Sequence, residues 1–313
     1  ERHLVTFGSG GDPRKIAWST REDNNDWTAK ATNTAGDLIV PTSGDILGAK
    51  KYKLDTIVFT ETGINRMYYS GNSFVYGIST AGENCRPLSM RAVVSAGDFL
   101  AWLGENSIFT YDGRVREIPS DVHDYIYDNL NYAMRSVAVG GHNSNYNEIW
   151  WFFPSSADTG YTPSRYVIWN YKDNTWSKGT GVDRGAWWDQ GVLDYPIAGD
   201  GSGNIVQHES TFLNNSLGLG SAKPFCTTGP IEIGRGDRLV QVNQIIPDSE
   251  AGTLPGVTLS FTGKFTANGA DTDFGSFTFE TDGYMDARFT ARTISMKVEG
   301  DTTQAFKLGQ VRV

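Results

Sequence analysis

An almost wholly apolar and aromatic run occupies residues 148–154 (EIWWFFP), and a second aromatic run follows at residues 166–171 (YVIWNY). Residues of these types fit the pleated surface of a β-sheet, and Pro154 ends the first run because it has no amide hydrogen to donate. The turn residues 172–174 (KDN) then lead to Trp176, which we expect to re-enter the same sheet. This unit presents more apolar surface than one hairpin can cover, so neighbouring sheets are expected to pack on both of its faces.

Shorter apolar runs recur along the first 225 residues, separated by clusters of Gly, Asn, Asp and Pro. Runs of this kind predict short strands joined by tight turns. Ser70-Gly71-Asn72 and Asp112-Gly113 are typical of hairpin turns. A polar loop twice returns a tryptophan to the strand before it, at Trp27 and at Trp176, which suggests a repeated sheet unit. The expected strands are residues 4–7, 15–19, 37–40, 56–60, 66–69, 74–76, 91–95, 98–103, 107–111, 186–188, 196–199 and 205–209, with one more beginning at Trp27.

One short helix is expected after Pro119, with Ser120 placed to cap the free amide groups of its first turn. Its length is roughly 12 residues, in an otherwise β chain. We place it on the outside of the body, between two sheets. The apolar positions at helical spacing on one face are Val122, Tyr125, Ile126 and Leu130.

The pattern changes near residue 225. No tryptophan follows Trp188, and the later strands alternate apolar with polar residues, so each has one face on a core and one in water. We therefore predict an all-β chain with a β-propeller-like domain over residues 1–225, which carries the helix, and a platform-like β-sandwich over residues 226–313. At about 40–45 residues per blade, the first domain holds about five blades. The expected later strands are residues 231–233, 240–242, 257–261, 276–279, 294–298 and 306–308.

Composition narrows the possible functions. Hydrophobic residues make up 39 % and aromatic residues 12 % of the 313 positions, which favours a folded protein. The net charge of −9 opposes wrapping around nucleic acid but is compatible with a wall that DNA slides past. Cys85 and Cys226 are predicted to be free thiols in a reducing cytosol. No apolar run approaches the ~20 residues needed to span a bilayer, so no membrane insertion is predicted. The chain opens on a strand without Met, and we expect it to be a segment of a longer protein.

Several short stretches lie in a characteristic order along most of the chain. They are residues 2–8 (RHLVTFG), 16–19 (IAWS), 111–113 (YDG), 148–151 (EIWW), 169–171 (WNY) with Trp176, 207–209 (QHE) and 306–309 (FKLG). In this order the chain resembles the tail nozzle proteins of short-tailed bacteriophages, also called tail tubular protein B or packaged-DNA stabilisation protein.

The resemblance implies a structural role in the virion. In such proteins a β-propeller lies on the outside of a hexameric tube with a β-sandwich platform, below the portal and the adaptor. The ring is assembled in the host cytoplasm, retains packaged DNA and conducts it during ejection, with transient, non-specific contact to double-stranded DNA. The implied partners are further copies of the chain, the adaptor or tail tubular protein, tail fibres or tailspikes, and a tail plug or needle.

Side chains able to catalyse reactions or bind metals do not occur at the spacings of known catalytic or metal-binding motifs. The four histidines, His3, His123, His142 and His208, do not match known metal-ligand patterns, and no phosphate-binding glycine loop is present. We therefore predict no catalytic, cofactor or metal site, no cofactor requirement and no enzymatic activity. The pair His208-Glu209 is interpreted as a structural hydrogen-bonding pair.

Two loops resemble ligand motifs without completing them. Residues 200–204 (DGSGN) carry oxygen side chains at alternate positions but lack the closing bidentate Glu of a calcium loop, so a turn is favoured. Residues 235–237 (RGD) spell an adhesion tripeptide, which we attribute to chance in a turn between strands.

Adjacent aromatic pairs leave the mode of contact open. In Tyr68-Tyr69, Trp150-Trp151 and Trp187-Trp188, neighbours point to opposite faces of a strand, so one of each pair is expected in the core. The other either packs against a partner subunit, which we favour, or stacks on a sugar. The sugar option supports an alternative function, a carbohydrate-binding or adhesin β-propeller module on a virion surface. A third option, a propeller hydrolase, requires acidic or Arg residues clustered at the propeller centre. The predicted aromatic core residues are Trp18, Trp27, Trp102, Trp150, Trp151, Trp169 and Trp176.

Overall fold

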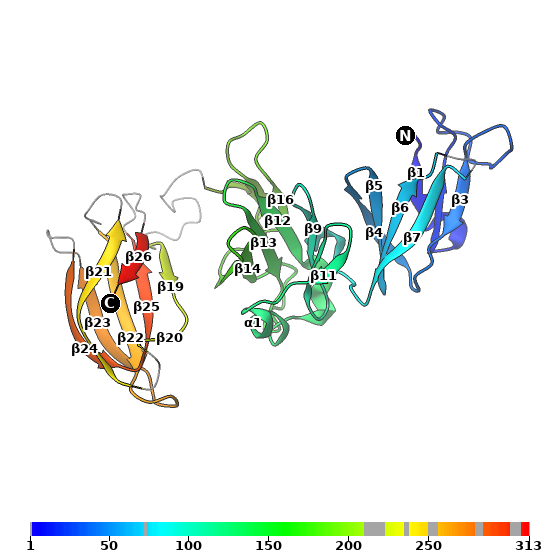
Figure 1. Ribbon diagram of the computed structural model, residues 1–313. Helices are drawn as coiled ribbons and strands as arrows, with labels where there is room; N and C mark the ends of the chain where they lie inside the picture. The colour runs from blue at the N-terminus through cyan, green and yellow to red at the C-terminus, as the bar shows by residue number, and fades with distance from the viewer. Residues whose placement is uncertain are drawn as a thin grey trace. The chain divides into compact units, whose positions relative to one another are not determined.

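The computed structural model describes residues 2–71, 74–209, 223–234, 238–249, 256–278, 284–300 and 308–312. These residues form short antiparallel strands and very little helix, so the chain is all-β as predicted. It divides into two compact units, unit 1 (Glu1–His208) and unit 2 (Glu209–Val313). Figure 1 traces unit 1 from blue to green and unit 2 from yellow to red.

Unit 1 contains five antiparallel sheets in its described part, and in each the strands follow chain order. Sheet 1 comprises β1 (Val5–Phe7), β2 (Lys15–Trp18) and β3 (Gly36–Ile39), with the 3₁₀ turn η1 (Ser9–Gly11) after β1. Sheet 2 comprises β4 (Ile46–Tyr52), β5 (Asp55–Thr60), β6 (Gly63–Tyr69) and β7 (Tyr76–Glu83). Sheet 3 comprises β8 (Val93–Ser95), β9 (Leu100–Leu103), β10 (Ile108–Tyr111) and β11 (Val115–Glu117). Sheet 4 comprises β12 (Val139–Asn143), β13 (Glu148–Phe153), β14 (Arg165–Asn170) and β15 (Thr175–Thr180). Sheet 5 comprises β16 (Ala186–Trp188), β17 (Ile197–Gly199) and β18 (Ile205–Gln207).

From sheet 2 to sheet 5, the first strand of each sheet contacts the first strand of the next sheet or the turn that leads into it. β12 contacts both β8 and β16, and β4 contacts the 3₁₀ turn η2 (Met90–Ala92) that leads into β8. Successive antiparallel sheets with neighbouring first strands are the arrangement of propeller blades around a centre. Unit 1 is therefore propeller-like, as predicted.

Hydrophobic residues fill the spaces between consecutive sheets. Sheets 1 and 2 share a cluster that includes Trp18 and Val58, and sheets 2 and 3 share one that includes Phe59 and Trp102. The largest cluster joins sheets 3 and 4 and contains Trp151. Sheets 2 and 3 thus bury apolar side chains on both faces. The aromatic run at residues 148–154 also packs on both faces, with Trp151 in the cluster toward sheet 3 and Trp150 stacked on Trp187 of sheet 5.

The α-helix α1 (His123–Tyr127) is shorter than predicted. Val122, not Ser120, occupies its N-cap, and Ser120 contributes only its backbone carbonyl, which accepts from the His123 amide at 3.4 Å. The helix ends early because Leu130 forms a β-bridge with Ser155. A 3₁₀ helix, η3 (Tyr132–Val137), follows.

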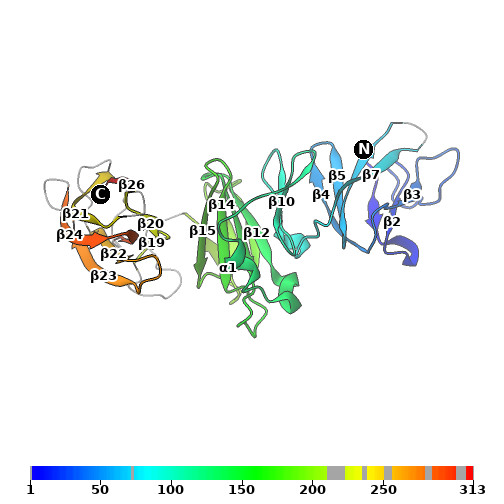
Figure 2. The same cartoon turned by 60° about the horizontal axis from the view of Figure 1, so that its bottom comes forward.

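The predicted apolar face of this segment does pack inward. Val122, Ile126 and Leu130 are buried in the cluster between sheets 3 and 4, and Tyr125 packs against its edge. The Tyr125 ring lies edge-on to Phe153 of β13 at 6.1 Å between centroids. Figure 2 shows α1 beside sheet 4.

Unit 2 is a β-sandwich, as predicted. One sheet has the order β19-β25-β22-β23 with β20 also on β25, and the other has the order β24-β21-β26. Phe261 and Ile294 from the first sheet and Val242 and Phe289 from the second are buried in one cluster. The strands are β19 (Phe225–Thr227), β20 (Ile231–Glu232), β21 (Val240–Ser249), β22 (Thr258–Lys264), β23 (Thr272–Thr278), β24 (Met285–Ala291), β25 (Thr293–Glu299) and β26 (Leu308–Arg312).

The division between the units lies after His208 rather than at residue 225. The predicted boundary falls inside β19, where Phe225 pairs with Glu299 of β25 and so belongs to the sandwich. The Gly- and Asn-rich stretch at residues 214–221, which the sequence suggests is a boundary or an exposed loop, lies outside the described residues.

Several local predictions were wrong, among them the strand expected at residues 74–76, where Phe74 lies in a turn and β7 begins only at Tyr76. Trp27 lies in a loop, where its indole donates to the Asn24 carbonyl at 2.7 Å, and the next strand is β3. Residues 90–92 form η2 instead of strand, because the Ser89 hydroxyl accepts from the Ala92 amide and closes a turn. The Asp112-Gly113 hairpin is one residue wider than expected, since Tyr111 pairs with Val115.

Candidate functional site

A layer of aromatic rings fills the space between sheets 4 and 5. Alternation along β13 directs Trp150 and Phe152 into this layer, while Trp151 faces sheet 3. Trp150 stacks on Tyr166 at 5.4 Å and on Trp187 of β16 at 5.9 Å between ring centroids. The layer joins the last two sheets of unit 1.

A glycine makes room for Trp187 in this layer. A Cβ built on Gly141 of β12 overlaps the indole of Trp187, so only glycine leaves space for the ring. The Trp187 indole also donates to the His142 carbonyl at 2.8 Å. The inward orientation of Trp187 is thus fixed by packing and by a hydrogen bond.

His208 and Arg184 border the aromatic layer. The His208 ring lies 4.4 Å from Trp187, and the Arg184 Nε atom donates to His208 Nε2 at 2.8 Å. Burial, aided by the positive charge of Arg184, lowers the pKa of His208 to about 4. Burial also lowers the pKa of Arg184, which is only 4 % exposed. The neutral His208 ring therefore serves as an acceptor for a buried guanidinium, and it is Arg184 that fixes its position.

Asp189 ties the loop after β16 to sheet 4. Its Oδ2 lies 2.9 Å from His142 Nδ1, and its Oδ1 accepts from the amide and hydroxyl of Ser144 at 3.2 and 3.1 Å. The Asn145 side-chain amide donates to the Asp194 carbonyl at 3.1 Å. These contacts hold residues 189–194 against the turn between β12 and β13.

Exposed apolar side chains lie on this anchored loop and on the segments next to it. Trp188 is 70 % exposed, and Val192 and Leu193 beside it are also exposed. Tyr146 lies on the adjoining β12–β13 turn and is exposed as well. We call Trp188, Val192, Leu193 and Tyr146 the Trp188 surface. An exposed tryptophan on a fixed backbone is a typical anchor of a binding interface, so the Trp188 surface is the candidate contact site.

The predicted aromatic residues take three kinds of position. Trp18, Trp102, Trp151 and Trp169 are buried. Trp150 is partly buried between sheets 4 and 5, and Trp176 is partly buried against the cluster between sheets 3 and 4. Trp27 is partly exposed in its loop. In the pair Trp187-Trp188 the first residue packs inward and the second faces solvent.

The tyrosine pair Tyr68-Tyr69 and the histidines His3 and His123 lie in sheets and turns. Tyr68 is partly buried under Arg66, while Tyr69 is exposed. His3 is within hydrogen-bond distance of Tyr76 and Thr34, and His123 of the Asn106 carbonyl.

Sequence reasoning missed Arg184 and Asp189, because neither belongs to a local motif. Their roles depend on His208 and on His142, which only the fold brings near them.

The loop at residues 200–204 forms a turn. Asp200 Oδ1 accepts hydrogen bonds from the backbone amides of Ser202 and Asn204 at 3.0 and 2.7 Å. The carboxylate therefore closes the turn. Within the described ranges, no group of three or more His, Cys, Asp or Glu side chains is arranged to hold a metal ion. Residues 235–237 lie outside the described residues. Cys85 and Cys226 are both free, as predicted.

Among the residues that the structure describes, no helix has the length and apolar character to cross a membrane.

No protein-family model matches the chain, and no curated protein matches it. Among solved structures, the N-terminal domain of Nup159 is similar over 95 % of this chain and 74 % of that chain, with 9 % identity and a TM-score of 0.40. A complex of S. cerevisiae Dbp5 with Nup159 and Gle1 gives 8 % identity, the same coverage and a TM-score of 0.40. A glycoside hydrolase gives 8 % identity and a TM-score of 0.28 over 98 % of this chain and 95 % of that chain. Similarities this low carry no argument about function.

Proposed function

We propose that this chain is a structural subunit of a bacteriophage tail nozzle. In this role, copies of the chain form a ring below the portal and adaptor of the virion, retain packaged DNA and conduct it during ejection. The observation that carries the proposal is the two-part architecture, a propeller-like unit 1 followed by a β-sandwich unit 2. That combination is the one implied by the resemblance of the sequence to tail nozzle proteins.

The packing of unit 1 supports a mechanical role. Aromatic side chains fill the spaces between sheets, and an indole hydrogen bond links sheet 5 to sheet 4, from Trp187 to the His142 carbonyl at 2.8 Å. Close-packed interiors of this kind resist deformation. A wall that holds DNA under pressure needs this rigidity.

The charge of the chain supports passage of DNA without binding. A net charge of −9 repels phosphate, so DNA inside a ring of such subunits would not adhere to the wall. Contacts with DNA would then be transient and independent of sequence.

The Trp188 surface supports contact with another protein. Exposed apolar groups on a fixed loop lose little conformational entropy on binding, which favours a permanent contact. We assign this surface to packing against a neighbouring subunit or another tail component.

Native mass spectrometry and negative-stain images of the full-length protein test this function. A ring, with six copies expected, supports it. Trp188→Ser should weaken the ring by removing an interface anchor, whereas Tyr161→Ser, which changes a residue that is 84 % exposed elsewhere in unit 1, should not. A full-length protein that stays monomeric at high concentration contradicts the proposal.

A second candidate function is a carbohydrate-binding or adhesin module on a virion surface. The 70 % exposed indole of Trp188 favours it, because flat aromatic faces stack on sugar rings. A glycan array separates the two functions. Saturable sugar binding that Trp188→Ser abolishes, in a protein that forms no ring, would favour the adhesin.

A further inference from the structure

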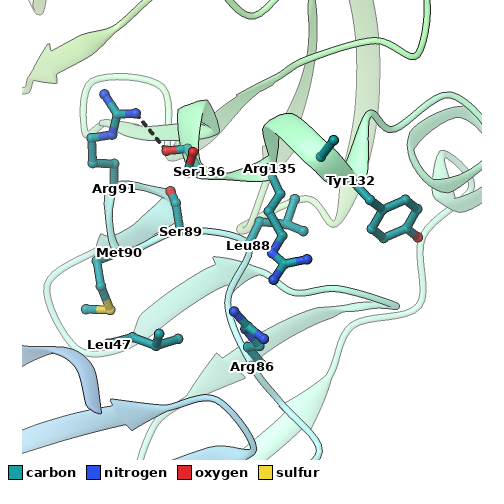
Figure 3. Close-up of a pocket in the computed structure, with 10 residues that line it drawn as sticks. Leu47, Arg86, Leu88, Ser89, Met90, Arg91, Tyr132, Arg135 and Ser136 are labelled. Carbon is teal, nitrogen blue, oxygen red and sulfur yellow. Dashed lines mark hydrogen bonds between the residues drawn. The ribbon is translucent and has the colours of Figure 1, made fainter. Parts of the chain in front are cut away.

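An open pocket of about 600 Å³ lies in unit 1 beside the start of sheet 3. Three segments line it: Leu47 of β4, residues 86–91 before β8, and residues 132–136 of η3. Figure 3 shows these segments around the space. Its size is within the range of ligand-binding pockets.

Hydrogen bonds fix the walls of the pocket. The Leu88 amide donates to the Leu103 carbonyl at 2.9 Å, and the Ser89 hydroxyl donates to the Ala138 carbonyl at 2.5 Å. Met90 packs closely on Gly48, where a Cβ would crowd its side chain. The pocket is therefore largely preformed, which lowers the entropy cost of binding.

Two arginines in the pocket share one carboxylate. Arg86 Nε lies 3.4 Å and Arg135 Nε 3.5 Å from the same oxygen, Oε1 of Glu105, both beyond the length of a good charge-assisted hydrogen bond. Although it is within ion-pair range of Glu105, Arg86 Nε is buried and makes no hydrogen bond. Each guanidinium carries five N–H donors, more than one shared carboxylate can accept, so a bound carboxylate would add acceptors for the remaining donors.

The pocket also holds a third cation. Arg91 Nη2 donates to the Ser136 carbonyl at 2.7 Å, a neutral acceptor that leaves its charge uncompensated (Figure 3). Within the described part of the chain, Glu105 and Glu61 are the carboxylates in ion-pair range of the three arginines, so one guanidinium is in excess. This local excess of positive charge contrasts with the net charge of −9 of the whole chain.

The pocket has apolar walls beside its arginines. Leu47, Leu88 and Met90 provide aliphatic and thioether surface. Guanidinium groups recognise carboxylates through paired hydrogen bonds, and the apolar wall matches an aliphatic side chain better than the hydroxyls of an acidic sugar or a hydrated phosphate. We propose that this pocket binds a peptide segment of a partner protein through an acidic side chain next to an aliphatic one. The inference does not depend on ring formation.

Two matched peptides test the proposal with the full-length protein. The probes are acetyl-Leu-Glu-Leu-amide and its neutral counterpart acetyl-Leu-Gln-Leu-amide, with affinity measured by saturation-transfer NMR and calorimetry. The Glu peptide should bind about tenfold more tightly or better, because its carboxylate accepts charge-assisted hydrogen bonds that the neutral amide cannot match.

Arginine variants show whether the binding occurs in this pocket. Arg91→Met and Arg135→Met keep an apolar stem but remove a donor, so each should largely remove the preference for the Glu peptide. Arg114→Met, in the exposed turn between β10 and β11, is the matched control and should retain it. Thermal unfolding of each variant confirms that it is folded.

Three results would overturn the proposal. They are equal affinity for the two peptides, an unchanged preference in both pocket variants, and competition by glucuronate or inorganic phosphate as effective as that by the Glu peptide. The last result would assign the pocket to an acidic sugar or a simple anion.

Discussion

His208 remains neutral because its surroundings oppose protonation in two ways. Its ring is packed against Trp187, and Arg184 donates a hydrogen bond to its Nε2 atom. Protonation would remove that acceptor and place two positive charges together. The pKa of His208 therefore falls from 6.5 to about 4 in the folded protein.

Unit 1 should lose stability in mild acid as a result. Between pH 6.5 and about 4 the unfolded chain binds a proton at His208 that the folded chain does not, so the free energy of unfolding falls as the pH falls. The full loss is about 3 kcal/mol, because one pKa unit corresponds to about 1.4 kcal/mol. Burial also lowers the pKa of His142, so His142 also makes the free energy of unfolding fall as the pH falls.

His208→Gln isolates the contribution of His208, because its amide oxygen accepts from Arg184 without titrating. Urea unfolding at pH 7 and pH 5 should show a smaller pH dependence for this variant than for the wild type. His123→Gln, which changes a partly exposed histidine, is the control and should behave as the wild type does. Equal pH dependence in His208→Gln and the wild type would contradict this account.

At the scale of elements, the contact between sheets 4 and 5 depends on one glycine. Gly141→Ala should displace Trp187 from the aromatic layer and lower the free energy of unfolding by about 1–3 kcal/mol, the usual cost of overpacking. Gly185→Ala, where a Cβ meets no atom within 4 Å, should change it by less than about 0.5 kcal/mol. Chemical denaturation measures both, and near-ultraviolet circular dichroism reports the tryptophan environment. A fully stable Gly141→Ala protein with an unchanged spectrum would be the contrary result.

Strands with dense apolar runs could be predicted from sequence, and mixed strands could not. β13 and β14 carry enough aromatic surface that only a buried sheet suits them. β4 (ILGAKKY) contains two lysines and a glycine, and its partner β5 supplies the pairing that makes it a strand. Trp27 has a strand-like side chain, yet its local indole hydrogen bond stabilises a loop.

The candidate sites show the same limit more strongly. Alternation predicts that one member of Trp187-Trp188 faces outward, but the choice depends on Gly141 in a different sheet. Arg86, Arg91 and Arg135 are distant in sequence and form no motif, so only the fold reveals their pocket. Local patterns report local structure, whereas these sites arise from contacts between sheets.

At the scale of the whole molecule, the two units have separate cores. Trp151 is fully buried in the cluster between sheets 3 and 4, and Phe261 is fully buried in the sandwich of unit 2. The clusters belong to different compact units, so each core should melt as its own cooperative transition. Scanning calorimetry of the full chain should therefore need two transitions to fit the heat absorbed.

Core substitutions assign these transitions. Trp151→Ala and Phe261→Ala each remove a large buried ring, at a cost of about 3–5 kcal/mol. Each should lower one melting temperature, by about 6–20 °C in unit 1 and by more than about 12 °C in the smaller unit 2, and leave the other within about 1 °C, because the two cores share no side chain. The same shift of both transitions by either substitution would mean that the units unfold together, and the separate cores would then be one thermodynamic domain.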